Sequence, residues 1–505
     1  MAQRSELANA TANNRASRDA STEHTAFDIN SFPPEILSLI FVASTSKLLD
    51  GPDILEWAQA VVARKKLITT TPLLLGSVCQ LWRRIAWSSP RLWTFIRLSI
   101  GSRTVVDLEV LSAWLDRSGQ LPLFIGVSGS SLSTHRRAAC LPWINLINQH
   151  SARWHELYLY LPLNFLSLFH TQHTTLQILC LRHNLPYFQE PHSIDLRRAS
   201  PTELELHSIW VSTIDIQFGK IRRALVDSLR VEDCVEFLKR APRLDYLKIR
   251  SMTSAHAVFV HFSLPTSPII QDGLRTLELD LSESAEDSIA DFWNSIALPN
   301  LETLNISLES LQVGPFVAFL KRSACPVTKF RLQFTGGADD GEDDLIHILE
   351  QMQYLQKLNL RPTSRRYSVD RLLQRLAKTC VFNESTFDSA FLPCLESFQY
   401  FSEKGIPWYL LASIFGQPAE LKNDPRRPLK HVEIYFEIYS LSATLPLVYM
   451  SLNTVEHFVQ ILERGNEIKV TFPDPDTNGR SYINLQDIME RSRGHWRTVN
   501  QSLIT

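Results

Sequence analysis

The chain has 505 residues, 44% of them hydrophobic and 21% charged, which is more apolar material than one compact core usually buries. Its 51 basic residues nearly balance its 53 acidic ones, and this balance argues against a nucleic-acid-binding protein. We therefore expect either several domains or an elongated array of repeats.

The N-terminus is polar and of mixed charge, without the apolar stretch of a signal peptide, so we expect residues 1–27 to form a disordered tail. A mitochondrial presequence is the alternative, but Glu6, Asp19 and Glu23 interrupt it. No run of about 18 apolar residues follows, so no membrane span and no membrane partner are expected.

Seven cysteines are scattered along the chain, at positions 79, 140, 180, 234, 325, 380 and 394. No two of them form a C-x-x-C pair, and several have apolar neighbours. This distribution favours reduced, buried thiols in a cytoplasmic and/or nuclear protein, and it argues against a zinc site.

The first predicted helix lies in the segment SFPPEILSLIF, residues 31–41. Pro33 and Pro34 suit the start of a helix, where the N–H groups have no intrahelical partner, and Glu35 complements the helix dipole. The apolar residues that follow occupy more than one stripe, whereas a surface helix needs only one. This helix therefore has apolar residues to spare on a second side.

A second helix is predicted in TPLLLGSVCQLWRRIAWSSPRLW, residues 71–93, because its apolar residues recur at steps of three and four. The residues of this stripe are Leu75, Val78, Trp82 and Ile85. Arg83 and Arg84 face the other way. Pro90 ends the helix, and an apolar turn follows it.

In this order the two segments resemble an F-box, and more narrowly the F-box proteins abundant in mushroom-forming fungi. The resemblance rests on Pro-Pro-Glu-Ile-Leu, then Val-Cys-x-x-Trp-Arg-x-Ile-Ala, then Ser-x-Pro-x-Leu-Trp. It covers residues 31–46 and 71–95, about a tenth of the chain. In that family the helices pack together and present one face to the Skp adaptor of a Skp–cullin–F-box ubiquitin ligase.

The resemblance implies an exposed apolar surface that binds a Skp-type adaptor subunit and, through it, a cullin. Matching positions give the adaptor-facing residues as Phe32, Pro33, Pro34, Ile36, Leu37, Ile40, Val78, Cys79, Trp82, Leu92 and Trp93. Some of them must instead hold the helices to each other, and the sequence does not separate the two sets. The alternative is that all of them form the internal core of a small helical domain.

The F-box-like domain is predicted to span residues 28–95, with its two halves farther apart than in a compact F-box. The intervening residues 47–70 have helical spacing and predict an inserted helix. That helix either lies on the others or partly obstructs adaptor docking.

The remaining chain repeats the phrase L-x-x-L-x-L, whose alternating apolar positions predict short strands with one buried face. Close copies lie at residues 176–182, 244–250, 274–280, 301–307 and 355–361. Looser copies lie at 154–161, 201–207, 327–334, 395–401 and 429–436. Further strands are predicted at 95–100, 121–127 and 466–474.

Helix-like segments separate these strands, at 105–119, 231–244, 287–301 and 343–355. One such unit cannot bury its apolar face alone, but a stack can. The array resembles degenerate leucine-rich repeats, and the alternative is an ordinary α/β domain with leucine-rich strands.

The predicted fold is therefore α/β: an N-terminal helical F-box, then a leucine-rich-repeat-like solenoid with a curved parallel sheet and outer helices. The solenoid would span residues 96–475. A C-terminal capping segment, including a helix with a polar outer side, would span residues 476–505.

The sequence carries no phosphate-binding loop, dinucleotide-binding fingerprint or H-E-x-x-H motif. The segment GVSGS, residues 126–130, lacks the last glycine of a nucleophile elbow and is interpreted as a loop. His183 and His192 are interpreted as loop histidines, with a ligand role as the alternative. We expect no catalytic residue, no cofactor and no metal ion.

The acidic run ADDGEDD, residues 338–344, does not match the spacing of an EF-hand loop. We interpret it as a solvated loop whose last acids, Asp343 and Asp344, favour the start of the next helix. Calcium binding and contact with a basic partner are the alternatives. Candidate anion contacts, with solvated charge as the other interpretation, are Arg365, Arg366, Arg426 and Arg427.

The resemblance implies an adaptor, not an enzyme. The N-terminal helices would dock on the Skp subunit, and the array would hold an unknown target protein. The alternatives are a non-degradative interaction scaffold, or a hydrolase or transferase, which would need a cluster of titratable groups in a pocket.

Overall fold

The computed structural model describes residues 29–46, 71–100, 107–129, 137–171, 175–183, 193–253, 263–282, 284–310, 312–335, 341–363, 367–380, 390–402, 406–417, 427–436, 449–473 and 481–502. The predicted tail, residues 1–27, and the predicted inserted helix, residues 47–70, lie outside these ranges.

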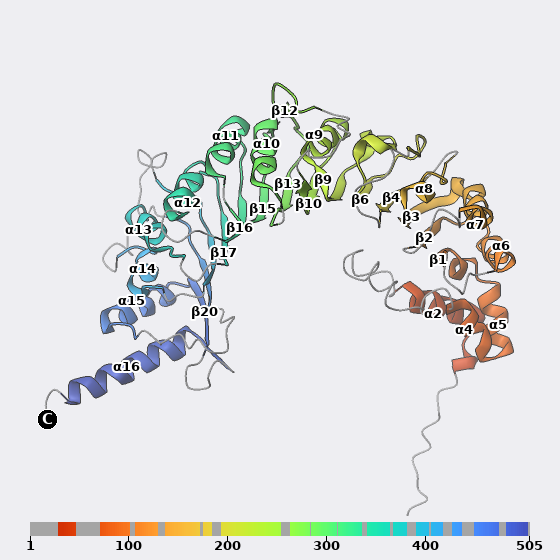
Figure 1. The fold of residues 1–505 in the computed structure, drawn as a ribbon. Helices are drawn as coiled ribbons and strands as arrows, with labels where there is room; N and C mark the ends of the chain where they lie inside the picture. The colour runs from red at the N-terminus through yellow and green to blue at the C-terminus, as the bar shows by residue number, and fades with distance from the viewer. Residues whose placement is uncertain are drawn as a thin grey trace, which may run out of the picture. The chain divides into compact units, whose positions relative to one another are not determined.

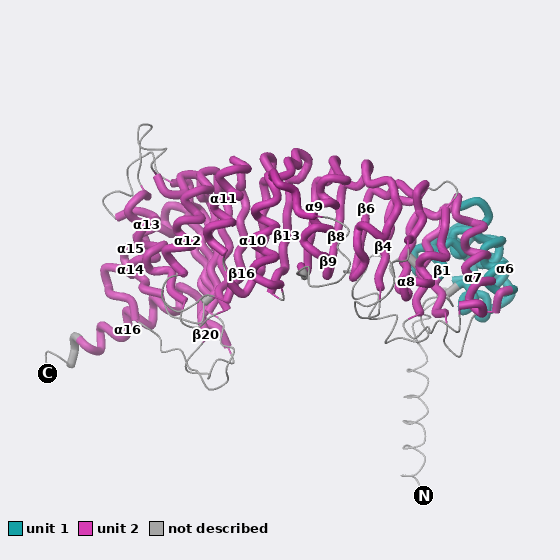
Figure 2. Tube along the Cα trace, turned by 45° about the horizontal axis from the view of Figure 1, so that its top comes forward, with its two compact units in different colours: residues 1–96, 109–121 teal, residues 97–108, 122–505 magenta. Residues whose placement is uncertain are grey.

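The chain divides into two compact units, which Figure 2 shows in different colours. Unit 1 contains residues 1–96 and 109–121, and unit 2 contains residues 97–108 and 122–505. Unit 1 therefore ends close to the predicted domain border at residue 95, but it also includes a helix that the sequence pattern assigned to the repeat array.

Unit 1 is helical in its described part. Its elements are η1 (Ile29–Ser31), α2 (Pro34–Ser46), α4 (Thr71–Val78), α5 (Gln80–Trp87), η2 (Pro90–Trp93) and α6 (Leu108–Arg117). The first helix begins at the two prolines as predicted, with Glu35 in its first turn. Helix α2 packs against α5 and η2, and α4 packs against α5.

The prediction of one continuous helix after residue 71 is wrong, because the chain breaks at Cys79 into α4 and α5. Cys79 has extended backbone angles (φ −157°, ψ 172°), and its Sγ accepts a hydrogen bond from the Trp82 amide at 3.4 Å. The Arg83 Nε group donates to the Gly76 carbonyl at 2.7 Å. Both contacts satisfy main-chain groups that a helix end leaves unpaired, so the break is stabilised locally.

Unit 2 is built around a large, open and mostly parallel sheet whose strands follow one another in nearly sequential order. The strands, in spatial order, are β1 (Phe95–Ser99), β2 (Leu123–Ser128), β3 (Trp154–Tyr160), β4 (Ile178–Arg182), β6 (Glu203–His207), β8 (Arg223–Asp227), β10 (Tyr246–Ile249), β13 (Thr276–Asp280), β15 (Thr303–Leu308), β16 (Lys329–Phe334), β17 (Lys357–Pro362), β18 (Ser397–Ser402), β19 (His431–Phe436), β20 (Glu467–Pro473) and β21 (Tyr482–Ile483). The pairs from β2 to β20 are parallel, and β20 pairs with β21 antiparallel.

Every segment that the repeated phrase marked as a strand is a strand of this sheet. The pattern missed β8, in which Ala224 and Val226 replace the leucines of the phrase. Both side chains are buried on the same face of the sheet as the leucines of the neighbouring strands. Leu204 pairs with Ala224, and Ala224 pairs with Leu247. Small residues fill these positions in β8, so a search for leucines does not find it.

Helices cover one face of the sheet, as Figure 1 shows for α9 to α12. The helices of unit 2 are α7 (Arg137–Gln149), α8 (Leu163–Leu166), α9 (Val231–Arg240), α10 (Glu286–Ser295), α11 (Val313–Ser323), α12 (Gly341–Leu349), α13 (Asp370–Lys378), α14 (Trp408–Ser413), α15 (Leu452–Glu463) and α16 (Leu485–Ser502). Short 3-10 turns are η4 (Ser151–Arg153), η5 (Val211–Thr213) and η6 (Phe218–Lys220). Two-stranded parallel pairs are β5 (Ile194–Asp195) with β7 (Ile214–Asp215), β9 (Leu229–Arg230) with β11 (Met252–Thr253), and β12 (Ile269–Ile270) with β14 (Ile296–Ala297).

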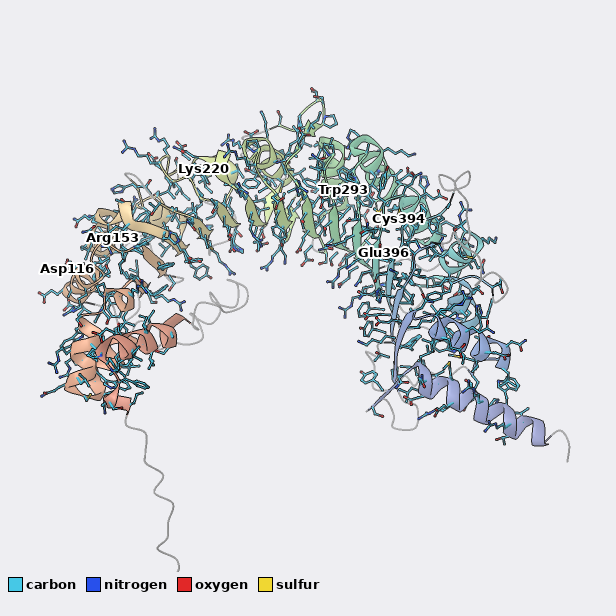
Figure 3. The ribbon with its side chains drawn as sticks, turned by 180° about the vertical axis from the view of Figure 1, so that it is seen from behind. Asp116, Arg153, Lys220, Trp293, Cys394 and Glu396 are labelled. Atoms are coloured by element: carbon cyan, nitrogen blue, oxygen red, sulfur yellow. The ribbon has the colours of Figure 1, made fainter. Side chains whose placement is uncertain are left out.

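The core of unit 2 consists of aligned rows of apolar side chains beneath the helices. In one row Leu247 pairs with Leu277 and Leu277 with Leu304, and all three are fully buried. Each such leucine contributes about 1.5–3 kcal/mol of transfer free energy. Helix residues complete the core: Trp293, labelled in Figure 3, lies 4.7 Å from the Phe319 ring between centroids. Stacking therefore buries what no single unit could bury.

The last helix, α16, packs on α15 and β20. Ile488, Met489 and Ser492 face this core, while the opposite side of the helix is exposed. None of the helices in the described ranges is both long enough and apolar enough to cross a membrane.

Candidate docking surfaces

Helix α2 has two apolar sides with different surroundings. Leu37 and Phe41 are buried, whereas Ile36, Leu39 and Ile40 are exposed to 40%, 56% and 38%. The exposed three follow i, i+3, i+4 spacing, so they form one stripe, which we call the α2 apolar face. The predicted second apolar side is confirmed, and Leu39 joins it although position matching did not select it.

Helix α4 has a comparable stripe that the sequence pattern did not single out. Leu73, Leu74 and Val78 are exposed to 43%, 60% and 60%, and we call them the α4 apolar face. The predicted set contained only Val78 from this stripe. Exposed leucines stand out only when burial is known, because their spacing equals that of a core helix.

Contacts on the buried sides of α2 and α5 fix the position of these helices. The Phe41 and Trp82 rings lie 4.8 Å apart between centroids, and the Trp82 indole N–H donates to Asn30 Oδ1 at 2.9 Å. The hydroxyls of Ser38 and Ser89 lie 2.8 Å apart and form a hydrogen bond. Trp82 is half-buried, and its contact with Phe41 joins α5 to α2.

Three residues of the predicted adaptor-facing set are core residues of unit 1, so they belong to the part of that set that holds the helices to each other. Leu37, Leu92 and Trp93 are at most 2% exposed. The Trp93 indole donates to the Ala86 carbonyl at 2.9 Å, and its ring meets Trp114 edge-on at 4.7 Å. Sequence spacing could not show this, because Trp114 comes from α6, beyond the resemblance.

The other predicted residues divide between surface and support. Pro33 and Pro34 are exposed, as are Ile36, Ile40 and Val78, while Phe32, Cys79 and Trp82 are half-buried. The Pro33 carbonyl accepts from the Leu37 amide at 3.1 Å, which continues the helix back to the proline. Pro33 and Pro34 thus extend the α2 apolar face at its N-terminal end.

Charge is almost absent from α2 and α4, where Glu35 is the single ionisable residue. Cations gather elsewhere in unit 1, around Trp87, whose ring lies 5.5 Å from the Arg83 guanidinium and 5.8 Å from that of Arg117. The apolar faces can therefore bind a partner by hydrophobic burial, with no titratable group in their centre.

The sheet of unit 2 has a second candidate surface, formed by the strand residues that point away from the helices. We call it the polar face. Alternation along each strand produces it: in β16, Phe330 and Leu332 are buried, while Lys329 and Arg331 are exposed. Lys357 of β17 is the register partner of Lys329 and is exposed as well.

Towards the C-terminal end, amides and a carboxylate join three strands of the polar face. Asn359 Nδ2 donates to Gln399 Oε1 at 2.6 Å, and Gln399 Nε2 donates to Glu433 Oε2 at 2.8 Å. The Tyr435 hydroxyl donates to the same carboxylate oxygen at 3.1 Å. This chain of hydrogen bonds fixes the side chains before any partner binds.

Aromatic rings lie beside this hydrogen-bond chain. The rings of Phe401 and Tyr435 stack at 4.7 Å, with the Arg361 guanidinium 5.0 Å from Phe401 and the Lys469 ammonium 5.6 Å from Tyr435. Tyr435 and Glu433 raise the pKa of Lys469. The polar face thus offers rigid aromatic and cationic groups, which suit recognition of another chain.

One of the candidate anion contacts has a structural role instead. Arg427 is buried, and its guanidinium donates to the carbonyls of Leu376, Phe391 and Leu392, among others. Burial lowers its pKa to about 10. Arg427 is therefore neither an anion contact nor solvated charge. Arg365, Arg366 and Arg426 lie outside the described residues.

The acids at the end of the run 338–344 lie in the first turn of α12, as predicted, and the first three residues of the run lie outside the described ranges. Asp343 forms an ion pair with Arg371, and Glu342 Oε1 accepts from the Leu372 amide at 2.8 Å. These contacts join α12 to α13, which gives the acids a structural role.

The prediction of a loop at residues 126–130 is wrong for its first part, because residues 126–128 end strand β2. Ser128 is buried, and the Gly129 amide donates to the Tyr160 carbonyl at 2.9 Å. His183 is buried directly after β4, and burial lowers its pKa. His192 lies outside the described residues.

Comparison with protein-family models gives no match for this chain, and comparison with curated proteins gives none either. Function therefore has to be argued from the two kinds of surface themselves.

Proposed function

We propose that the chain is the substrate-recognition adaptor of a Skp–cullin–F-box type ubiquitin ligase. In this proposal α2, α4 and α5 form an F-box that docks on a Skp-type subunit and through it on a cullin. The sheet and its helices form a leucine-rich-repeat-like solenoid that binds a target protein.

The exposed α2 apolar face is the observation that carries the proposal. It lies in the segment that resembles an F-box, and it leaves Ile36, Leu39 and Ile40 exposed although the same helix buries Leu37 and Phe41. Concentrated exposed apolar surface marks a protein–protein contact, since a soluble chain otherwise gains by covering it.

The register of the sheet supports the solenoid. Parallel strands from successive units pair without offset, and their leucines stack in rows beneath the helices. Such an array presents a long, continuous strand face with variable side chains, which suits binding of an extended protein surface. The adaptor then needs no catalytic group of its own, because holding the target near a ubiquitin-conjugating enzyme raises its effective concentration.

Binding of the full chain to a recombinant Skp-type adaptor subunit tests the proposal. Ile36→Asp with Leu39→Asp places two charges in the α2 apolar face, and we expect affinity to fall on the order of tenfold or more. Val110→Asp is the matched control, because Val110 is an equally exposed apolar residue of unit 1 (44%) but lies on α6.

Unchanged binding of the Ile36/Leu39 variant, or no binding by the wild type, would contradict docking through α2. A wild type that does not bind the adaptor subunit would favour the interaction scaffold. Circular dichroism of each variant shows whether the fold is intact.

Co-purification from proteasome-inhibited cells tests the second half of the proposal. We expect target proteins recovered with the wild type to be lost with Arg331→Glu plus Lys357→Glu on the polar face. Lys321→Glu, an exposed cation on α11, serves as the matched control and should retain them. Loss with Lys321→Glu alone would place target binding on the helical side.

A further inference from the structure

A compact group of side chains with three different ligand types lies on the polar face at the N-terminal half of unit 2. Cys180 of β4 is the register partner of Glu205 of β6, and His207 follows Glu205 by two residues on the same face. The Sγ, carboxylate and imidazole ligand atoms all lie within 4.8 Å of one another. This is the single such group of histidine, cysteine and acidic side chains in the part of the chain that the structure describes.

The imidazole of His207 is oriented by a carboxylate on the next strand. His207 Nδ1 lies 3.2 Å from Asp227 Oδ2, and the Ser228 hydroxyl donates to Asp227 Oδ1 at 3.1 Å. With its Nδ1–H donated to Asp227, the ring directs Nε2 towards Glu205, whose Oε2 lies 3.7 Å away. Histidines that bind a metal through one ring nitrogen typically donate the N–H of the other ring nitrogen to a carboxylate.

The three side chains lie largely out of solvent, and the carboxylates of Glu205 and Asp227 lie on either side of His207. Cys180 and His207 are 5% and 4% exposed, and Glu205 is half-buried. Arg182, a cation on the same strand as Cys180, has its guanidinium 5.1 Å from the centre of the Tyr160 ring. A divalent cation bound here would displace the proton of the Cys180 thiol to solvent and would offset the charges of the thiolate and of Glu205 together.

We propose that Cys180, Glu205 and His207 bind a zinc ion, with Asp227 as the residue that positions His207. Thiolate, imidazole and carboxylate are the three ligand types of protein zinc sites. In a tetrahedral site ligands about 2.0–2.3 Å from the metal lie about 3.3–3.8 Å from each other. His207 Nε2 and Glu205 Oε2 already lie 3.7 Å apart, and no pair has to close by more than about 1.5 Å. Three protein ligands leave a fourth position for water or an incoming group.

This inference goes beyond the proposed adaptor function and does not depend on it. Sequence spacing argued against zinc because paired ligands at short distance were absent. Here the ligands come from two strands of different repeats, and only strand pairing brings Cys180 beside Glu205.

The test uses the full chain, dialysed against zinc chloride and then against buffer, with zinc measured by atomic emission. We expect about one zinc ion per wild-type chain. Substitution with cobalt should give a thiolate-to-cobalt charge-transfer absorption. Cys180→Ser should abolish that absorption, whereas Cys325→Ser, a half-buried cysteine of the α11–β16 connection, should leave it unchanged.

Two further variants keep the test decisive if Cys180→Ser does not fold. Glu205→Gln preserves size at a half-buried position and should weaken zinc binding, measured by competition with a colorimetric chelator. Asp227→Asn should weaken it about 10–100-fold through the orientation of His207. A wild-type affinity for zinc no higher than that of Glu205→Gln, or an absorption that survives Cys180→Ser, would overturn the proposal and leave a histidine–carboxylate network.

Discussion

The helices of unit 1 and the strands of unit 2 are equally rich in leucine and isoleucine, yet they bury these side chains to different extents. In α2 half of the apolar residues in one short helix remain exposed, as Ile36 and Leu39 do. In β15 every second residue is apolar and fully or nearly fully buried, as Leu304 and Ile306 are. In unit 2 the neighbouring strands and helices cover these side chains, whereas among the described residues α5 and η2 pack against one side of α2 and leave the other exposed.

Exposure, and not apolar content, distinguishes a candidate interface from a core in this chain. Apolar content alone does not, because both regions have it. An apolar residue whose own unit already has a full set of buried neighbours, and which stays exposed, is available to another protein.

The largest effect is expected within unit 1, from Trp93→Ala. This side chain is buried against Trp114 and hydrogen-bonded to the Ala86 carbonyl, so truncation should lower the free energy of unfolding by about 3–5 kcal/mol. Denaturant unfolding followed by circular dichroism measures it. Trp87→Ala, at an exposed tryptophan of the same unit, should cost much less, and equal costs would contradict the assignment of Trp93 to the core.

A pair of variants on one strand tests unit 2 in the same way. Leu304→Ala removes a fully buried side chain and should cost about 2–5 kcal/mol. Asn305→Ala, the next residue, lies on the polar face and should change stability by about 0.5 kcal/mol. If thermal and denaturant unfolding find both variants alike, the inward and outward directions of β15 are wrong.

The exposed side of α2 should tolerate change, in contrast to both core sites. Leu39→Ser should alter the free energy of unfolding by no more than about 0.5 kcal/mol, because the side chain is exposed to 56%. It should also raise the solubility limit of the isolated chain, since it reduces exposed apolar surface. A large loss of stability would mean that Leu39 is buried in solution.

The smallest effect concerns a histidine within unit 2. Burial lowers the pKa of His457, whose Nε2 lies 2.8 Å from the Gly416 carbonyl, so the folded state holds it neutral. The unfolded chain takes up a proton as the pH falls below about 6.5, so stability should decrease in that direction. His457→Gln should flatten this part of the pH profile of unfolding, and an unchanged slope would show that other groups produce it.

Much of the architecture follows from the sequence alone. The repeated phrase predicts the strands because alternation of apolar and polar residues is a local property of an extended chain. Two prolines followed by Glu35 predict the start of α2 for a similarly local reason. The excess of apolar residues in α2 also predicts that one of its sides lacks a partner in its own chain.

Packing between distant segments determines which residues of an element are covered. Leu37 and Ile36 are neighbours with the same chemistry, and their burial differs because α5 and η2 pack against one side of α2. The break at Cys79 depends on Arg83 reaching back to Gly76, and the Trp93 contact depends on α6. Cys180, Glu205 and His207 meet because parallel strands pair in register, a long-range event that no local pattern records. Sequence fixes the period of burial in each element, but the partner that covers a face is set by packing between distant segments.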